Sequence, residues 1–138
     1  MSAVKLGPKS QERLNQVRAD LKAVCYKAFE TMPFDITITE GLRSQKRQAE
    51  LFAQGATKVM TSRHMSGNAI DMCPYPVDYN DTARFKIMAH HMFAAAKELG
   101  TTIRWGGNWS RIDENQPYPP LKPGSKPLVD MPHFELPA

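Results

Sequence analysis

The sequence predicts an α+β fold: a small single domain in which a mostly antiparallel sheet packs against helices. Three segments have helical character, and four short segments have the alternating or β-branched composition of strands. The 138 residues, 41% hydrophobic and 23% charged, are enough to bury a core without disulfides or a structural metal. No repeat, low-complexity tract or linker interrupts the chain, so residues 1–138 are interpreted as one domain.

The first segment, from residue 10 to about residue 31, predicts one amphipathic helix. Ser10 is the expected N-cap, and Pro33 ends the helical pattern. The apolar positions at helical spacing are Leu14, Val17, Leu21, Val24, Cys25, Ala28 and Phe29.

Residues 34–39 follow as a strand, because isoleucines alternate there with polar residues. A second helix is expected from the cap Ser44 to about Gln54, where Gly55 stops it. The polar residues 56–68 then indicate a loop.

The second half of the chain predicts three further strands and one long helix. Strands are expected at 69–73 and 101–105, on either side of a helix over 81–99 with apolar residues on one side. Residues 113–127 contain five of the eleven prolines, too many for a helix or a central strand, so they predict an irregular loop. A strand over 131–136 completes the domain.

The charge and cysteine content limit the classes of partner. A net charge of +4 favours polyanions, but the basic residues are scattered and lack interleaved aromatics, so no nucleic-acid partner is expected. Cys25 and Cys73 are in no metal-binding or redox motif and are expected to be buried. No segment is apolar enough for an export signal or a membrane span, so we expect synthesis in the cytoplasm and no membrane insertion.

The segment 62–71 contains the first candidate metal ligands, His64 and Asp71. Asp71 interrupts an otherwise apolar strand, where an ionised carboxylate is costly to bury unless a cation pairs with it. Imidazole and carboxylate groups both bind zinc well. On spacing alone, the pair fits either a metal site or ordinary structural roles.

The segment 129–136 supplies a third ligand, His133, which shares a strand face with Glu135. Two histidines and one aspartate leave a tetrahedral zinc with an open position, as in catalytic sites, although such ligands also accept other divalent ions. Asp130 is the natural general base and proton donor. Arg43 is expected to stabilise an oxyanion or bind a substrate carboxylate, or else to form a surface ion pair.

Two motifs together resemble a known family of zinc peptidases. The pattern Ser62-x-His64-x-x-Gly67-x-Ala69-x-Asp71, followed by Asp130-x-x-His133, resembles the paired zinc motifs of the D-Ala-D-Ala carboxypeptidases and dipeptidases, peptidase family M15. The wider layout, including Gly41-x-Arg43, Arg104-x-Gly106 and the final 133–136 segment, is similar to the short phage endolysins of that family, which act as L-alanyl-D-glutamate peptidases.

The resemblance implies a role for each candidate residue. One zinc ion would be bound by His64, Asp71 and His133, at a site on the sheet. Asp130 would be general base and acid, Arg43 would polarise the carbonyl, and Ser62 would contact substrate. From its own position beside the Gly106-Gly107 turn, Trp109 is a further candidate for binding a peptide stem, as is Trp105, for which a core role is equally expected.

Two departures from the family pattern favour the endolysin branch. Asp130 replaces the glutamate usual in the dipeptidases and carboxypeptidases, and Pro132 replaces an aromatic residue before the last histidine. The resemblance thus implies a monomeric phage lysis enzyme that hydrolyses the L-alanyl-D-glutamate bond of peptidoglycan and needs a membrane-permeabilising protein to reach the wall. A D-Ala-D-Ala dipeptidase or carboxypeptidase, and a non-catalytic zinc-bound module that binds the cell wall, are the alternatives.

Overall fold

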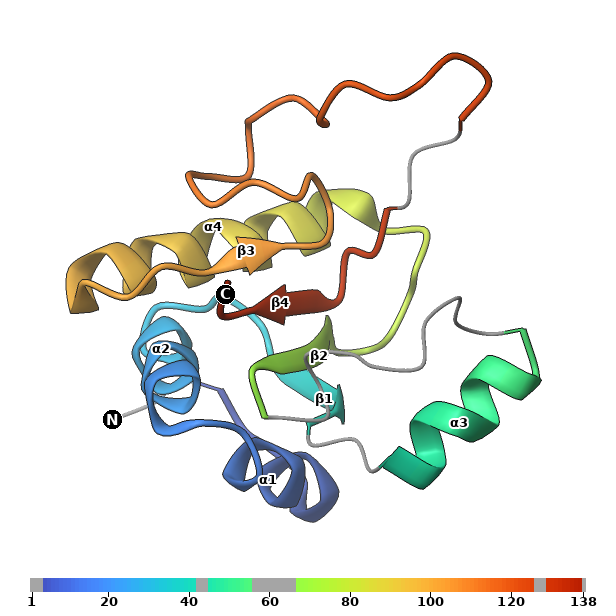
Figure 1. The fold of residues 1–138 in the computed structure, drawn as a ribbon. Coiled ribbons are helices and arrows are strands. Elements are labelled where there is room, and N and C mark those ends of the chain that lie inside the picture. Colours follow the sequence, from blue (N-terminus) through green and yellow to red (C-terminus); the bar gives the residue numbers. More distant parts are fainter. Residues whose placement is uncertain (1–3, 42–44, 56–66, 126–128, 138) are drawn as a thin grey trace.

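The computed structural model describes residues 4–41, 45–55, 67–125 and 129–137 (Figure 1). The helices in these ranges are α1 (Pro8–Asn15), α2 (Ala19–Phe29), α3 (Gln45–Ala53) and α4 (Thr82–Leu99). The strands are β1 (Ile36–Glu40), β2 (Ala69–Pro74), β3 (Arg104–Trp105) and β4 (His133–Glu135).

The strands form one antiparallel sheet in the order β1-β2-β4-β3, which confirms the predicted fold class. The last strand of the chain therefore lies inside the sheet, between β2 and β3 (Figure 1). This placement puts the C-terminal segment beside residues that lie about 60 positions earlier in the sequence.

One face of the sheet forms the core, because side chains alternate between the two faces of a strand. Each strand contributes buried apolar residues to this face, and α4 packs against both β2 and α2. The strand residues on this face are Ile36, Ile38, Ile70, Met72, Trp105 and Phe134. The other face carries Asp71, Arg104, His133 and Glu135, so the candidate ligands Asp71 and His133 share one side of the sheet.

The prediction of one helix over residues 10–31 is wrong, because two helices occupy this segment. Arg18 has extended backbone angles (φ −58°, ψ 151°), and its N–H donates to the carbonyl of Gly67 at 2.9 Å instead of continuing a helix. Ser10 is not an N-cap, since it lies inside α1, where its hydroxyl accepts a hydrogen bond from the Ile38 N–H at 3.0 Å. A contact with β1 therefore takes the place of the expected cap.

The remaining helices and strands agree with prediction in position, but the two C-terminal strands are shorter than predicted. Asp81 caps α4 by accepting from the Arg84 N–H, and Gly55 and Gly100 follow α3 and α4 with positive φ. Only residues 104–105 and 133–135 of the two C-terminal segments pair as strands. Cys25 and Cys73 are buried free thiols, as predicted. Within the described part of the chain, no helix combines the length and apolar character needed to cross a membrane.

Candidate metal and catalytic site

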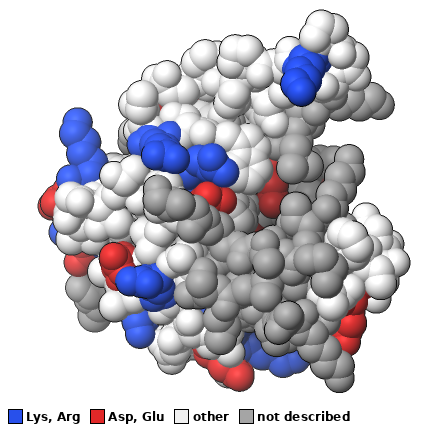
Figure 2. All heavy atoms as spheres, viewed as in Figure 1, with Lys and Arg blue, Asp and Glu red and all other residues white. Residues whose placement is uncertain are grey.

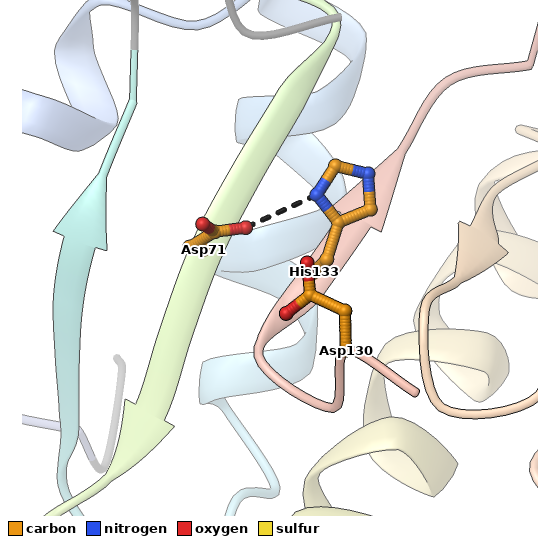
Figure 3. Close-up of side chains that lie close together, drawn as sticks. All are labelled: Asp71, Asp130 and His133. Atoms are coloured by element: carbon orange, nitrogen blue, oxygen red, sulfur yellow. Dashed lines mark hydrogen bonds and ion pairs between the residues drawn. The ribbon is translucent and has the colours of Figure 1, made fainter. Parts of the chain in front are cut away.

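Strand register brings two of the candidate metal ligands, Asp71 and His133, together. Asp71 of β2 and His133 of β4 are direct partners in the antiparallel ladder. Side chains of such partners are neighbours on the same face, and here Nδ1 of His133 lies 3.1 Å from Oδ1 of Asp71. Figure 3 shows the two side chains pointing toward each other from adjacent strands.

Asp130 joins them from the turn that precedes β4. Its backbone carbonyl accepts a hydrogen bond from the His133 N–H at 3.1 Å, which holds the turn closed. Donor atoms of Asp71, Asp130 and His133 all lie within 4.8 Å of one another (Figure 3). Two carboxylates and one imidazole therefore converge at one point on the polar face of the sheet.

This donor set fits a divalent metal ion. Carboxylate oxygens and imidazole nitrogens are both ordinary ligands of zinc, and a catalytic zinc site usually has three protein ligands and one open position. His133 is buried and Asp71 and Asp130 are partly buried, so the acidic groups gather beside a largely desolvated imidazole. A cation would balance the charge of this cluster.

The carboxylates also determine the protonation of His133 in the metal-free protein. Burial lowers the pKa of His133, but hydrogen bonds to Asp71 and Glu135, together with the charges of Asp71 and Asp130, outweigh it and raise the pKa from 6.5 to about 9. The protonated ring can donate from Nδ1 to Asp71 and from Nε2 to Glu135, at 3.1 and 2.8 Å. At neutral pH, a metal ion must therefore displace the proton on Nδ1.

The raised pKa predicts that the metal-free protein loses stability as the pH rises. Protonated His133 stabilises the fold fully below its unfolded pKa near 6.5, and this contribution disappears as the pH passes the folded value of about 9. The shift corresponds to at most about 3 kcal/mol of unfolding free energy. Urea unfolding with a chelator at pH 6, 7.5 and 9 will measure it. His133→Gln should lack this component, and equal pH slopes in the two proteins would contradict the assignment.

Gly106 holds the turn that contains Asp130 against β3. Its N–H donates to the His133 carbonyl at 2.8 Å, and its carbonyl accepts from the Asp130 N–H at 2.9 Å. A Cβ at this position would overlap the carbonyl oxygen of Asp130 and lie 3.0 Å from Cβ of His133. A side chain here therefore cannot be accommodated without moving two of the three converging residues.

Gly106→Ala is accordingly expected to lower the unfolding free energy by about 1–3 kcal/mol, the usual cost of overpacking. It should also weaken zinc binding, because Asp130 and His133 both move. Urea unfolding and chelator competition measure the two effects. Gly7→Ala is the control, since nothing lies within 4 Å of the Cβ position at Gly7. Unchanged zinc affinity in a destabilised Gly106→Ala protein would show that the turn does not position the donors.

The two tryptophans beside the Gly106-Gly107 turn have different surroundings. Trp105 is a core residue: its ring stacks on Phe134 at 6.5 Å, and its indole N–H donates to the Met131 carbonyl at 2.7 Å. Trp109 is partly buried with a positive φ of 55°, and its ring lies 5.6 Å from that of His133. Of the two, only Trp109 borders the candidate metal site.

Three predicted site residues, Arg43, Ser62 and His64, lie outside the described residues. Their assigned roles as carbonyl-polarising residue, substrate contact and zinc ligand stay predictions. Of the other four, Asp71, Asp130 and His133 come together, and Trp109 lies at their edge. Arg104 was not predicted to contact the site. It is the ladder partner of Glu135, and its Nε lies 3.3 Å from Oε2 of that residue. Strand pairing between distant segments is the signal that would have revealed this contact.

Figure 2 shows one face of the molecule. Lys and Arg side chains lie at several places on the described part of this face, and acidic side chains lie close to some of them. This distribution agrees with the scatter of basic residues along the sequence.

Comparisons with known proteins identify relatives over almost the whole chain. A family model described as "Phage L-alanyl-D-glutamate peptidase" matches residues 1–137. The L-alanyl-D-glutamate peptidase of Escherichia phage T5 is 34% identical over 112 residues, which cover 77% of this chain and 82% of that protein.

A bacterial protein and a crystal structure show the same likeness. The peptidoglycan L-alanyl-D-glutamate endopeptidase CwlK of Bacillus subtilis is 34% identical over 105 residues, covering 64% of this chain and 60% of CwlK. The crystal structure of the L-Ala D-Glu endopeptidase ChiX of Serratia marcescens matches with a TM-score of 0.77 and 30% identity, covering 97% of this chain and 91% of ChiX.

Proposed function

The chain belongs to the phage L-alanyl-D-glutamate peptidase family, and we propose that it is a zinc-dependent peptidoglycan peptidase that hydrolyses the L-alanyl-D-glutamate bond of the stem peptide. One observation carries the proposal: Asp71, Asp130 and His133 converge within 4.8 Å on the polar face of the sheet. Asp130 is a second carboxylate beside Asp71 and His133, which already contact each other. A module that only binds the wall would not need this additional carboxylate.

We propose that Asp71 and His133 bind zinc together with His64, and that Asp130 is the general base and acid. When bound, zinc lowers the pKa of water to about 7 and polarises a carbonyl group. Asp130 then takes the proton from the attacking water and delivers it to the departing amine of D-glutamate. Arg43 would stabilise the negative charge that develops on the carbonyl oxygen.

Trp109 and Ser62 are the proposed substrate contacts. The Trp109 ring lies beside His133, so a stem peptide that reaches the metal must pass close to it. An aromatic face provides apolar contact area for the peptide backbone and side-chain methyl groups.

The enzyme is proposed to act at the bacterial cell wall as a monomer with one catalytic domain over residues 1–138. After synthesis in the host cytoplasm, it would need a separate membrane-permeabilising protein to reach the wall. Its net charge of +4 favours the anionic envelope, and raised salt should therefore weaken its binding to isolated walls.

The proposal is tested by incubating the zinc-loaded protein with purified peptidoglycan, with and without a chelator, and identifying new amino termini by mass spectrometry. New D-glutamate amino termini that disappear on chelation support it. Released D-alanine would assign the chain to the carboxypeptidase activity, and cleavage of free D-Ala-D-Ala alone would assign it to the dipeptidase activity. Wall binding without any cleavage would indicate a non-catalytic module.

A further inference from the structure

A buried carboxylate lies on the side of His133 that faces away from Asp71. Oε1 of Glu135 is 2.8 Å from Nε2 of His133, and Oε2 of Glu135 is 3.3 Å from Nε of Arg104. The Arg104 guanidinium lies over the Trp109 ring at 4.8 Å, and that ring lies 5.6 Å from His133. His133, Glu135, Arg104 and Trp109 thus form a closed ring of contacts.

We propose that Glu135 and Arg104 are positioning residues for metal binding: Glu135 accepts a hydrogen bond from the Nε2–H of His133, so that the unprotonated ring nitrogen is Nδ1, the metal ligand, and Arg104 holds Glu135 in place. This inference rests on the proposed zinc site. It gives a role in metal binding to two residues, Glu135 and Arg104, that do not themselves contact metal or substrate.

The sheet dictates the arrangement. His133 and Glu135 are two positions apart on β4 and therefore share a face. Asp71 is the ladder partner of His133, and Arg104 is the ladder partner of Glu135. Strand pairing, and not a flexible loop, therefore fixes the positions of Asp71, Arg104, His133 and Glu135. Strands hold a binding site more precisely than loops.

Burial indicates that the pairing of Glu135 matters energetically. The Glu135 side chain is only 6% exposed, and an ionised carboxylate at such a position is costly unless it is paired. Arg104 Nε is buried too and, within the part of the chain that the structure describes, makes no hydrogen bond of good geometry. Its contact with Glu135 is therefore an attraction between charges, which fixes the carboxylate while its other oxygen accepts from His133.

The chemistry of imidazole explains the effect on the metal. A neutral imidazole carries one N–H, and whichever nitrogen lacks the proton can bind a metal. Nδ1 is the ring nitrogen that lies 3.1 Å from Asp71, one of the three converging residues, whereas Nε2 contacts Glu135. Carboxylate partners of metal-binding histidines fix the ring in this way, and their loss typically weakens metal binding about 10- to 100-fold.

The competing explanation is that Glu135 and Arg104 form an ion pair that merely stabilises the sheet. Removal of a purely structural pair would lower stability and leave the zinc affinity of the folded protein unchanged. The proton on His133 would also stay on Nε2. Zinc affinity, measured in the folded variants, therefore separates the two explanations.

The test measures zinc affinity by competition with a chromogenic chelator for the wild type, Glu135→Ala and Glu135→Gln. We expect a loss of about 10- to 100-fold for Glu135→Ala. Glu135→Gln, which keeps the volume and an acceptor oxygen, should recover part of this loss and guards against misfolding of the alanine variant. In the zinc-loaded wild type, the ¹⁵N shifts should show the proton on Nε2.

Two further variants complete the design. Arg104→Met should weaken zinc binding less than Glu135→Ala, and the double variant Arg104→Met/Glu135→Ala should be no worse than Glu135→Ala alone, because Arg104 acts through Glu135. Glu30→Gln is the matched control, since Glu30 also pairs with a cation at 3.3 Å, that of Lys27, but on the surface. Its zinc affinity should equal that of the wild type.

The outcomes distinguish failure of the positioning role from failure of the proposed function. Wild-type zinc affinity in both folded Glu135 variants would overturn the positioning role alone. A wild type that binds no zinc would overturn both this inference and the zinc-dependent function. Reduced zinc affinity in the Glu135 variants, with a wild type that leaves the L-alanyl-D-glutamate bond intact, would support the positioning role and overturn the proposed substrate.

Discussion

Replacing Asp130 with asparagine is expected to lower kcat for peptidoglycan cleavage about 10²- to 10⁴-fold, the usual contribution of a general acid–base residue. Asparagine has nearly the same shape as aspartate, but its amide cannot take a proton from water. The Asp130 turn should survive, because Gly106 and His133 hold it through backbone hydrogen bonds. The rate of appearance of new D-glutamate termini, measured against zinc content per chain, checks this prediction.

The zinc content of Asp130→Asn distinguishes the two roles available to this residue. Asp130 lies close enough to Asp71 and His133 to act as a ligand itself. Full zinc occupancy with little turnover supports the role of base, whereas loss of zinc would make Asp130 a ligand and require another base. Asp20→Asn is the matched control, because the Asp20 side chain is 55% exposed and makes only a 3.9 Å ion pair.

Replacing Asp71 with alanine is expected to abolish detectable cleavage by removing zinc. A direct ligand should contribute more than a partner of a ligand, so we expect zinc affinity to fall more than about 100-fold, beyond the loss typical of such partners. Asp71 also supports the protonated state of His133, so the metal-free variant should titrate that histidine at a lower pKa than the wild type. Chelator competition and NMR titration measure the two effects.

Asp20→Ala is the control for this substitution, and its zinc affinity and cleavage rate should match those of the wild type. Zinc binding by Asp71→Ala at wild-type strength would remove Asp71 from the ligand set. Raised zinc concentration should restore some activity to Asp71→Ala but none to Asp130→Asn, because only the first defect is one of affinity.

The sequence predicted most elements because their signals are local. The helix over 81–99 is closed by its own residues: Asp81 caps α4, and Gly100 ends it in the left-handed conformation. The error over residues 10–31 has the opposite cause. Apolar spacing continues from Val17 to Leu21, yet the backbone leaves the helix at Arg18, whose N–H donates to the carbonyl of Gly67, a residue far along the chain. A pattern read within one segment does not contain that bond.

The candidate site was predicted to a similar extent and for similar reasons. Asp71 stood out because a carboxylate inside an apolar strand needs a cation, and its convergence with His133 and Asp130 agrees with that argument. Trp105 and Trp109 flank the same glycine pair, and for Trp105 a core role was expected as readily as a contact with the stem peptide. Only packing separates them, because the Trp105 ring stacks on Phe134 while that of Trp109 lies beside His133.

The sequence by itself determined which side chains are available and which share a strand face, because side-chain direction alternates with a period of two whatever the fold. His133 and Glu135 had to lie together for that reason. Only the tertiary structure decided that β4 enters between β2 and β3, which places Asp71 opposite His133 and Arg104 opposite Glu135. Strand order and register depend on the burial of the whole apolar face and on pairing between distant segments, so no local pattern contains them.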